Sequence, residues 1–214
     1  SEGVNSVVQD LQQNEFDTIL ILERNADDHA NITDELYIWE KLAAMTEKEI
    51  LFLDTLAEVQ CKNIAYPDRA IIFKMQHKRN KRTIQKITEN NHERWDFIVY
   101  QFAIPGFAKG TQHAQIGFLL DENQCPKPTA SEDRVFYTFY PATRERHGFP
   151  FYIHSYFMLS PNREYFNNEL EYVERNKILL ESLADQLVEA VLPKLKIDFP
   201  NIFLPNILVP NIPD

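Results

Sequence analysis

The stretch best suited to chemistry lies where an apolar segment gives way to a polar turn. Residues 150–159 form a largely apolar run, residues 160–162 (Ser-Pro-Asn) are typical of a turn, and Arg163 follows where a long helix is predicted to begin. A guanidinium is planar, permanently charged and suited to bidentate contact with phosphate. Arg163 could therefore act as an arginine finger that reaches a γ-phosphate held by another domain. The alternative is a structural ion pair with Glu164 or a neighbouring acid.

No other group of residues has a spacing that specifies chemistry. The six histidines lack metal-ligand spacing, and His154, inside an apolar segment, is predicted to be a satisfied core or edge histidine. Neither Cys61 nor Cys125 has a histidine close to it in sequence. Because there is no G-x-S-x-G, C-x-x-C or Walker A motif, nucleophilic, redox and phosphate-loop chemistry have no sequence support.

A basic cluster surrounds a predicted hairpin tip between residues 74 and 82. It comprises Lys74, His77, Lys78, Arg79, Lys81 and Arg82. Such a cluster could contact nucleic acid or an acidic partner, or it could be an ordinary solvated turn. The chain as a whole carries a net charge of −10, which argues against nonspecific binding to nucleic acid or to anionic membranes.

The composition predicts one globular domain with a real core. The chain has 214 residues, of which 44% are hydrophobic and 25% charged. Only 5 glycines and 2 cysteines are present, too few for a glycine-rich nucleotide loop or a disulfide scaffold. No apolar run is long enough to span a membrane and no signal peptide is recognisable, so we expect a cytoplasmic protein without membrane attachment.

The elements that must position Arg163 are predicted from hydrophobic periodicity. A capped helix is expected from Thr33 to about Ala43, and residues 50–56 fit a short helix or a strand. The following segments alternate like the strands of a largely antiparallel sheet: 58–64, 70–76, 83–88, 94–104, 112–120, 134–140 and 149–159. An earlier buried strand is expected at residues 16–22.

One long helix is predicted from about Glu164 to Val191, ended or kinked by Pro193. Its expected buried stripe comprises Phe166, Leu170, Val173, Leu180, Ala184, Leu187, Val188 and Val191. After it, Pro-Asn-Ile recurs at residues 200, 205 and 210, and proline at this density predicts an extended strip. That tail could be a strap for a partner or a second copy, or it could lie on its own domain.

Several short motifs around Arg163 resemble one family. The turn at residues 160–163 with Glu164, followed by Asn-Lys-Ile-Leu at residues 176–179, is similar to the middle domain of the ninety-kilodalton heat-shock chaperones. The sacsin-like branch of the GHKL ATPases is more similar still. The matching segments are Phe139-Tyr-Pro-Ala-Thr143, Pro150-Phe-Tyr-Ile-His154, Ser160-Pro-Asn-Arg163 and Ile50-Leu-Phe-Leu-Asp-Thr-Leu56.

The resemblance implies an α+β (mixed α/β) transducer domain of the ribosomal-protein-S5-like type, at residues 31–196. Residues 1–30 would be a linker and the last strand of an ATP-binding domain outside this chain, and residues 197–214 the tail. Arg163 would contact the γ-phosphate of ATP, with Asn162 and Asn167 as nucleotide-binding neighbours. Asn167 stands where the chaperones carry a longer glutamine.

The resemblance also implies a division of labour. ATP and Mg²⁺ would be bound mainly by the absent domain, since its D-x-G-x-G motif and glycine lid do not occur here. Expected partners are that domain, client proteins and a second copy. Two alternatives stay open: a noncatalytic protein-interaction module, and an accessory domain for nucleic acid that uses the basic cluster.

Overall fold

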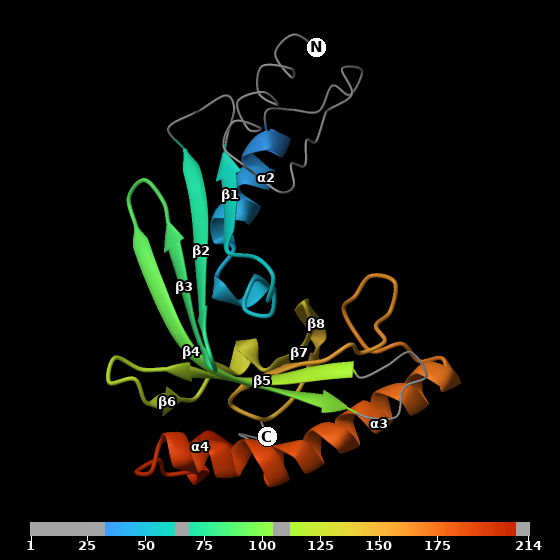
Figure 1. Cartoon of the computed structure of the whole chain (residues 1–214). Helices are drawn as coiled ribbons and strands as arrows, with labels where there is room; N and C mark the ends of the chain where they lie inside the picture. Colours follow the sequence, from blue (N-terminus) through green and yellow to red (C-terminus); the bar gives the residue numbers. More distant parts are fainter. Residues whose placement is uncertain (1–32, 63–68, 105–111, 209–214) are drawn as a thin grey trace. The chain divides into compact units, whose positions relative to one another are not determined.

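The structure is a computed structural model that describes residues 33–62, 69–104 and 112–208 (Figure 1). The chain divides into two units after Ile38, and the second unit, from Trp39 onward, holds every described strand. The predicted strand at residues 16–22 and the expected linker at residues 1–30 lie outside the described residues.

One largely antiparallel sheet organises the second unit and confirms the predicted α+β class. Its strands are ordered β1-β2-β3-β4-β5-β9-β7-β8, with β6 beside β5, and β7–β9 is the one parallel pair among the described strands. The strands are β1 (Glu58–Lys62), β2 (Ala70–Lys78), β3 (Lys81–Ile87), β4 (His92–Ile104), β5 (Gln112–Leu120), β6 (Pro126–Lys127), β7 (Val135–Thr138), β8 (Tyr140–Arg146) and β9 (Tyr152–His154).

Strict alternation of side chains gives the sheet two buried faces. On β4, Ile98 and Tyr100 face a core shared with the long C-terminal helix, whereas Phe97 and Val99 face a second core. The second core is covered by residues 50–52, which follow the short 3₁₀ helix η1 (Glu47–Glu49). Residues 50–56, predicted to be a helix or a strand, are neither, and residues 50–52 pack as buried turns.

The helices are α2 (Thr33–Ala44), α3 (Leu170–Gln186), a π-helical segment η3 (Leu187–Val191), α4 (Leu192–Asp198) and α5 (Pro205–Leu208), with a short 3₁₀ turn η2 (Ser131–Asp133). The helix predicted at Thr33 is confirmed.

Figure 1 shows α3 and α4 one after the other beneath β5. Pro193 does not end the helix, because it follows the π segment, where hydrogen bonds span five residues rather than four. In the described ranges, no helix has both the length and the apolar character needed to cross a membrane.

The predicted buried stripe of this helix is wrong in part. Leu170, Val173 and Val188 are exposed, and Asn176, Leu179, Leu183 and Leu195, which lie outside the predicted stripe, are buried. Val191 is buried as predicted. The helix begins at Leu170 instead of Glu164, and Leu170 and Val173 lie on the exposed face of its first turns. The π segment adds one extra residue to a later turn, which rotates only the positions after it, by about 100°. A uniform 3.6-residue period cannot represent that rotation.

Two other predictions need correction. The last strand, expected over residues 149–159, shrinks to β9, and strand β8 was not foreseen. The tail is not an extended strip over its described part, since Pro205 begins helix α5. Proline is tolerated at the first helical position, where no intrahelical partner for its nitrogen is needed. Phe199, Ile202, Leu204 and Leu208 pack against the core on the helix side of the sheet.

Candidate functional site

Arg163 lies at the tip of a small hairpin, which we call the arginine hairpin (residues 158–167). Asn167 donates its backbone N–H to the Met158 carbonyl at 2.9 Å, Leu159 bridges Phe166, and Ser160 donates its N–H to the Tyr165 carbonyl at 2.8 Å. The prediction that Arg163 opens the long helix is wrong, because α3 begins only at Leu170. Backbone pairing across this short turn replaces the expected first helical turns.

The backbone of Arg163 is held in an unusual conformation. Its N–H donates to the Ser160 carbonyl at 2.8 Å, which closes a turn with Pro161 at the second position. Proline presets φ for that position of a turn. Arg163 follows with φ of 58°, in the left-handed region that a side chain with a Cβ disfavours. The tip therefore presents Arg163 at a fixed place and at a small conformational cost.

The Arg163 side chain is exposed, and its guanidinium makes no hydrogen bond or ion pair with any residue that the structure describes. Its acidic neighbour Glu164 is engaged elsewhere: Arg144 Nε lies 3.0 Å from Glu164 Oε2. The structural alternative, in which Arg163 pairs with Glu164, is therefore wrong. Among the described residues, no carboxylate forms an ion pair with this guanidinium, and a ligand could reach it.

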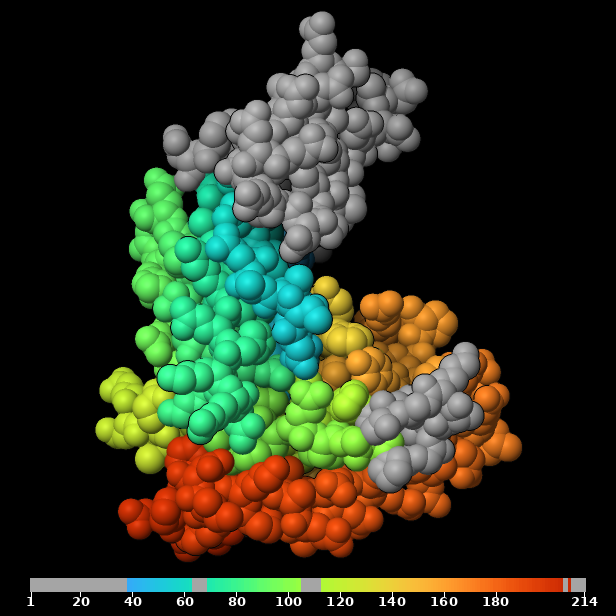
Figure 2. Space-filling view, in the orientation of Figure 1, coloured from blue at the N-terminus to red at the C-terminus, as the bar shows by residue number. Residues whose placement is uncertain are grey.

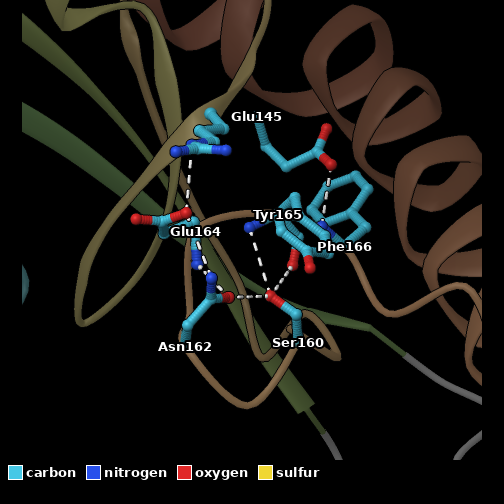
Figure 3. Close-up of polar contacts among 7 residues, drawn as sticks. Glu145, Ser160, Asn162, Glu164, Tyr165 and Phe166 are labelled. Carbon is cyan, nitrogen blue, oxygen red and sulfur yellow. Dashed lines mark hydrogen bonds and ion pairs between the residues drawn. The ribbon is translucent and has the colours of Figure 1, made fainter.

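Asn162 shapes the turn (Figure 3). Its Oδ1 accepts hydrogen bonds from Ser160 Oγ at 2.6 Å and from the Glu164 N–H at 3.3 Å, and its Nδ2 donates to Glu164 Oε2 at 3.0 Å. The Ser160 hydroxyl, itself buried, also lies 3.0 Å from the Tyr165 carbonyl, which is a second acceptor for its single proton. Both amide atoms of Asn162 are thus used within the hairpin, which fixes the residue beside Arg163.

Asn167 lies at the base of the arginine hairpin, where it pairs with Met158. The pairs Leu159–Phe166 and Ser160–Tyr165 lie between it and the tip. Its Oδ1 accepts the Glu169 N–H at 2.9 Å, just before α3 begins. This is the local turn that asparagine side chains form before helices. The structure therefore brings Asn162 and Arg163 together and gives Asn167 a role in starting the helix.

Strand β8 holds the arginine hairpin from one side. Arg144 donates its backbone N–H to the Glu164 carbonyl at 2.8 Å. Glu145 Oε1 accepts the Phe166 N–H at 2.7 Å (Figure 3). Sequence reasoning missed both residues because it ended the preceding strand at Tyr140. The alternating charges Arg144-Glu145-Arg146 were the available signal for an exposed strand.

An aromatic cluster fixes the base of the hairpin. The rings of Phe136, Phe157 and Phe166 form a triangle in which each pair of centroids is 5.1 Å apart. Tilted and edge-to-face aromatic pairs at this spacing contribute about 0.5–1.5 kcal/mol each beyond the burial of their area. The exposed Arg163 thus stands on a base anchored in the helix-side core.

The basic cluster is smaller than the sequence suggests. Residues 78–81 turn between β2 and β3 as predicted, but Arg82 is buried and lies 2.8 Å from Asp54, with a second hydrogen bond to Gln115 at 3.0 Å. Burial lowers the pKa of the Arg82 guanidinium, and the nearby Asp54 opposes that shift. Arg82 therefore fastens the turn at residues 51–54 to the sheet and is not available to nucleic acid.

His154 is a core residue, as predicted, but its ring is not satisfied. It stacks on Phe52 with centroids 4.8 Å apart, and neither ring nitrogen has a hydrogen-bond partner among the described residues. Burial lowers its pKa to about 3, helped by the charge of Arg82. His154 is therefore neutral at physiological pH.

Over the described ranges, no three His, Cys, Asp or Glu side chains cluster in a way that could hold a metal ion.

The chain matches none of the family models, curated proteins or solved structures with which it was compared. The case for a site consequently rests on the geometry of the arginine hairpin. Arg163 fits a phosphate oxygen, since its guanidinium is exposed, charged and unpaired within the described part of the chain. Asn162 and Asn167 have their amide oxygens engaged within the protein and fit that role less well.

Proposed function

We propose that this chain is the middle (transducer) domain of a GHKL-type ATPase, of the sacsin-like and heat-shock-chaperone-like branch, and that Arg163 contacts the γ-phosphate of ATP bound by a separate N-terminal domain. The observation that carries the proposal is an exposed guanidinium, without a partner among the described residues, on a hairpin in which the side chains of Ser160, Asn162 and Glu164 are all bonded. Such a group on a rigid tip is suited to an incoming anion.

The role of this chain in the reaction is positioning. ATP and Mg²⁺, when bound by the other domain, supply the phosphoryl group and the metal charge. Arg163 contributes a fixed positive charge where negative charge gathers on the phosphoryl oxygens. The turn around Asn162 holds the backbone of Arg163, and β8 holds the hairpin, so little rearrangement is needed when the phosphate arrives.

The same arrangement supports the transmission of nucleotide state. A γ-phosphate contact would draw the arginine hairpin toward the nucleotide domain, and hydrolysis would release it. Because the hairpin is bonded to β8 and rests on the Phe136–Phe157–Phe166 cluster, movement of the tip would be passed to the sheet. Client or partner proteins would then sense the change through this domain.

The test is ATP turnover by the full-length protein with Arg163→Ala. Loss of an arginine finger lowers turnover by about 10³–10⁵-fold. Arg94→Ala is the matched control, because Arg94 is an exposed arginine on β4, outside the arginine hairpin, and is paired with Asp96. A drop under about tenfold for Arg163→Ala, with the fold intact, rejects the proposal.

A noncatalytic interaction module is the second candidate, favoured by exposed aromatic side chains. Tyr140 is 48% exposed, and Phe139, Tyr156 and Tyr165 are each more than a third exposed. Phe139 has a φ of 68° and packs edge-on against Tyr156, with centroids 5.4 Å apart. Aromatic residues are enriched at protein interfaces. Replacing Tyr140 with serine should weaken self-association or client binding without affecting ATP turnover.

A further inference from the structure

A buried amide in the middle of helix α3 is hydrogen-bonded to the arginine hairpin. Asn176 is 3% exposed and lies on the buried face of α3. Its Oδ1 accepts the Met158 N–H at 2.8 Å, and its Nδ2 donates to the Met158 carbonyl at 2.9 Å. One side chain thus satisfies both backbone polar groups of Met158, as a neighbouring strand would.

This contact fastens the first rung of the arginine hairpin. Met158 is the residue whose carbonyl also accepts the Asn167 N–H, and the next rungs lead through Leu159 and Ser160 to the turn at Arg163. Leu179, one turn further along α3, is fully buried in the helix-side core. The amide therefore joins the hairpin to a helix whose own position is set by the core.

Apolar packing could not replace this amide. An apolar residue at this position would take away the partner of the Met158 N–H, and a buried polar group without a partner is unfavourable. What the amide adds is direction, because two hydrogen bonds fix the register of Met158 along α3, and apolar packing would allow it to slide.

We infer that Asn176 is a positioning residue, which couples the placement of Arg163 to the position of α3. Movement of α3 then moves the arginine finger. The inference about position stands on the contacts above, and its consequence for catalysis rests on the proposed function.

Hydrogen exchange of the chain tests the coupling. Asn176→Asp keeps the shape and the acceptor but loses the donor at neutral pH, and a buried carboxylate binds its proton at a higher pH than usual. We expect exchange across residues 158–165 to rise about tenfold relative to wild type at pH 8. At a pH near 4, the protonated carboxyl can again donate to Met158, and the wild-type rate should return. Strand β3 should exchange as in wild type throughout.

Two further variants keep the inference falsifiable. Asn176→Leu removes both hydrogen bonds and keeps the branching of the side chain at Cγ, although its volume is larger, and should loosen the hairpin at every pH. Lys177→Ala changes the exposed neighbouring residue and should change nothing. Unaltered hairpin exchange in both Asn176 variants, or an equal rise in β3, overturns the inference.

ATP turnover by the full-length protein separates this inference from the proposed function. The Asn176 variants should lower kcat with a smaller effect on KM, since they displace Arg163 without removing it. If exchange rises while Arg163→Ala leaves turnover unchanged, the coupling stands and the proposed function fails. If Arg163→Ala abolishes turnover and the Asn176 variants leave both exchange and kcat unchanged, the coupling fails and the proposed function stands.

Discussion

Glu164 is paired with Arg144 and not with its neighbour Arg163: the Arg144 Nε lies 3.0 Å from Glu164 Oε2, and the Arg144 N–H donates to the Glu164 carbonyl at 2.8 Å. A carboxylate beside an arginine finger would compete with phosphate for the guanidinium. The pairing with Arg144 removes that competitor. It is the reason why one arginine of this region is structural and the other is available.

Substitutions at Arg163 should separate the effect of its backbone conformation on stability from the effect of its side chain. Arg163→Ala should change the free energy of unfolding by less than about 0.5 kcal/mol, because the guanidinium has no bonding partner among the described residues. Arg163→Gly should be more stable than Arg163→Ala by about 1 kcal/mol, because glycine adopts the left-handed conformation at φ of 58° without strain. Urea unfolding measures both. Equal stability of the two variants would show that the turn is not strained.

The buried rings of His154 and His147 predict how stability depends on pH. Their pKa values are lowered to about 3 and about 4 respectively, from 6.5, chiefly by burial. At pH values between these lowered pKa values and 6.5, the folded protein therefore binds fewer protons than the unfolded chain. The stability they contribute is complete above pH 6.5 and is lost as the pH falls toward 4 and then 3, by up to about 1.4 kcal/mol per pH unit for each ring.

His154→Phe isolates one of these rings. Phenylalanine keeps the stacking on Phe52 and removes two ring nitrogens that have no partner among the described residues. We expect the variant to be about 1 kcal/mol more stable at pH 7, with a larger advantage at pH 5. Unfolding at both pH values checks this. An advantage that stays constant with pH would contradict the lowered pKa.

Paired substitutions should reveal which face of α3 is buried. Leu183→Ala should cost about 2–5 kcal/mol, because the side chain is 5% exposed in the helix-side core. Leu170→Ala should cost less than about 0.5 kcal/mol, because Leu170 is 77% exposed. Thermal unfolding compares the two. A large cost at Leu170 would show that this side chain is buried, as a uniform helical period predicts, and would contradict the exposed position described above.

The residues after α4 should stabilise the domain. Ile202 packs against the helix-side core, whereas the neighbouring Phe203 is 64% exposed. Ile202→Ala should lower the free energy of unfolding by about 1 kcal/mol, and Phe203→Ala should leave it nearly unchanged. If neither substitution affects stability, residues 199–208 do not belong to the core and the strap interpretation regains support.

The sheet was largely predictable from sequence, because alternating side chains and turn residues are local signals. Strand β5 was predicted at its observed bounds, and the hairpin at residues 78–81 was expected from its composition. The space-filling view shows β5 lying over the C-terminal helices (Figure 2). Hydrophobic periodicity also identified α3, but not the π segment, whose extra residue leaves no mark in the local pattern.

The site was predictable in part. Arg163 could be singled out because its residue type and its turn are visible in sequence. Its surroundings could not be, because they depend on contacts across 18 to 21 residues, from Asn176 to Met158 and from Glu145 to Phe166. Asn162 and Asn167 were expected to be nucleotide-binding neighbours of Arg163, and nothing in the sequence indicated that their side chains close local turns.

The most direct test of the central claim is proximity. An ATP analogue with a photoreactive group on its γ-phosphate should be crosslinked to the full-length protein and the labelled peptides identified by mass spectrometry. We expect label within residues 159–166, lost in the presence of excess ATP and unchanged by Arg94→Ala. Label that ATP displaces but that lies only in other peptides would contradict the assignment of Arg163 to the γ-phosphate.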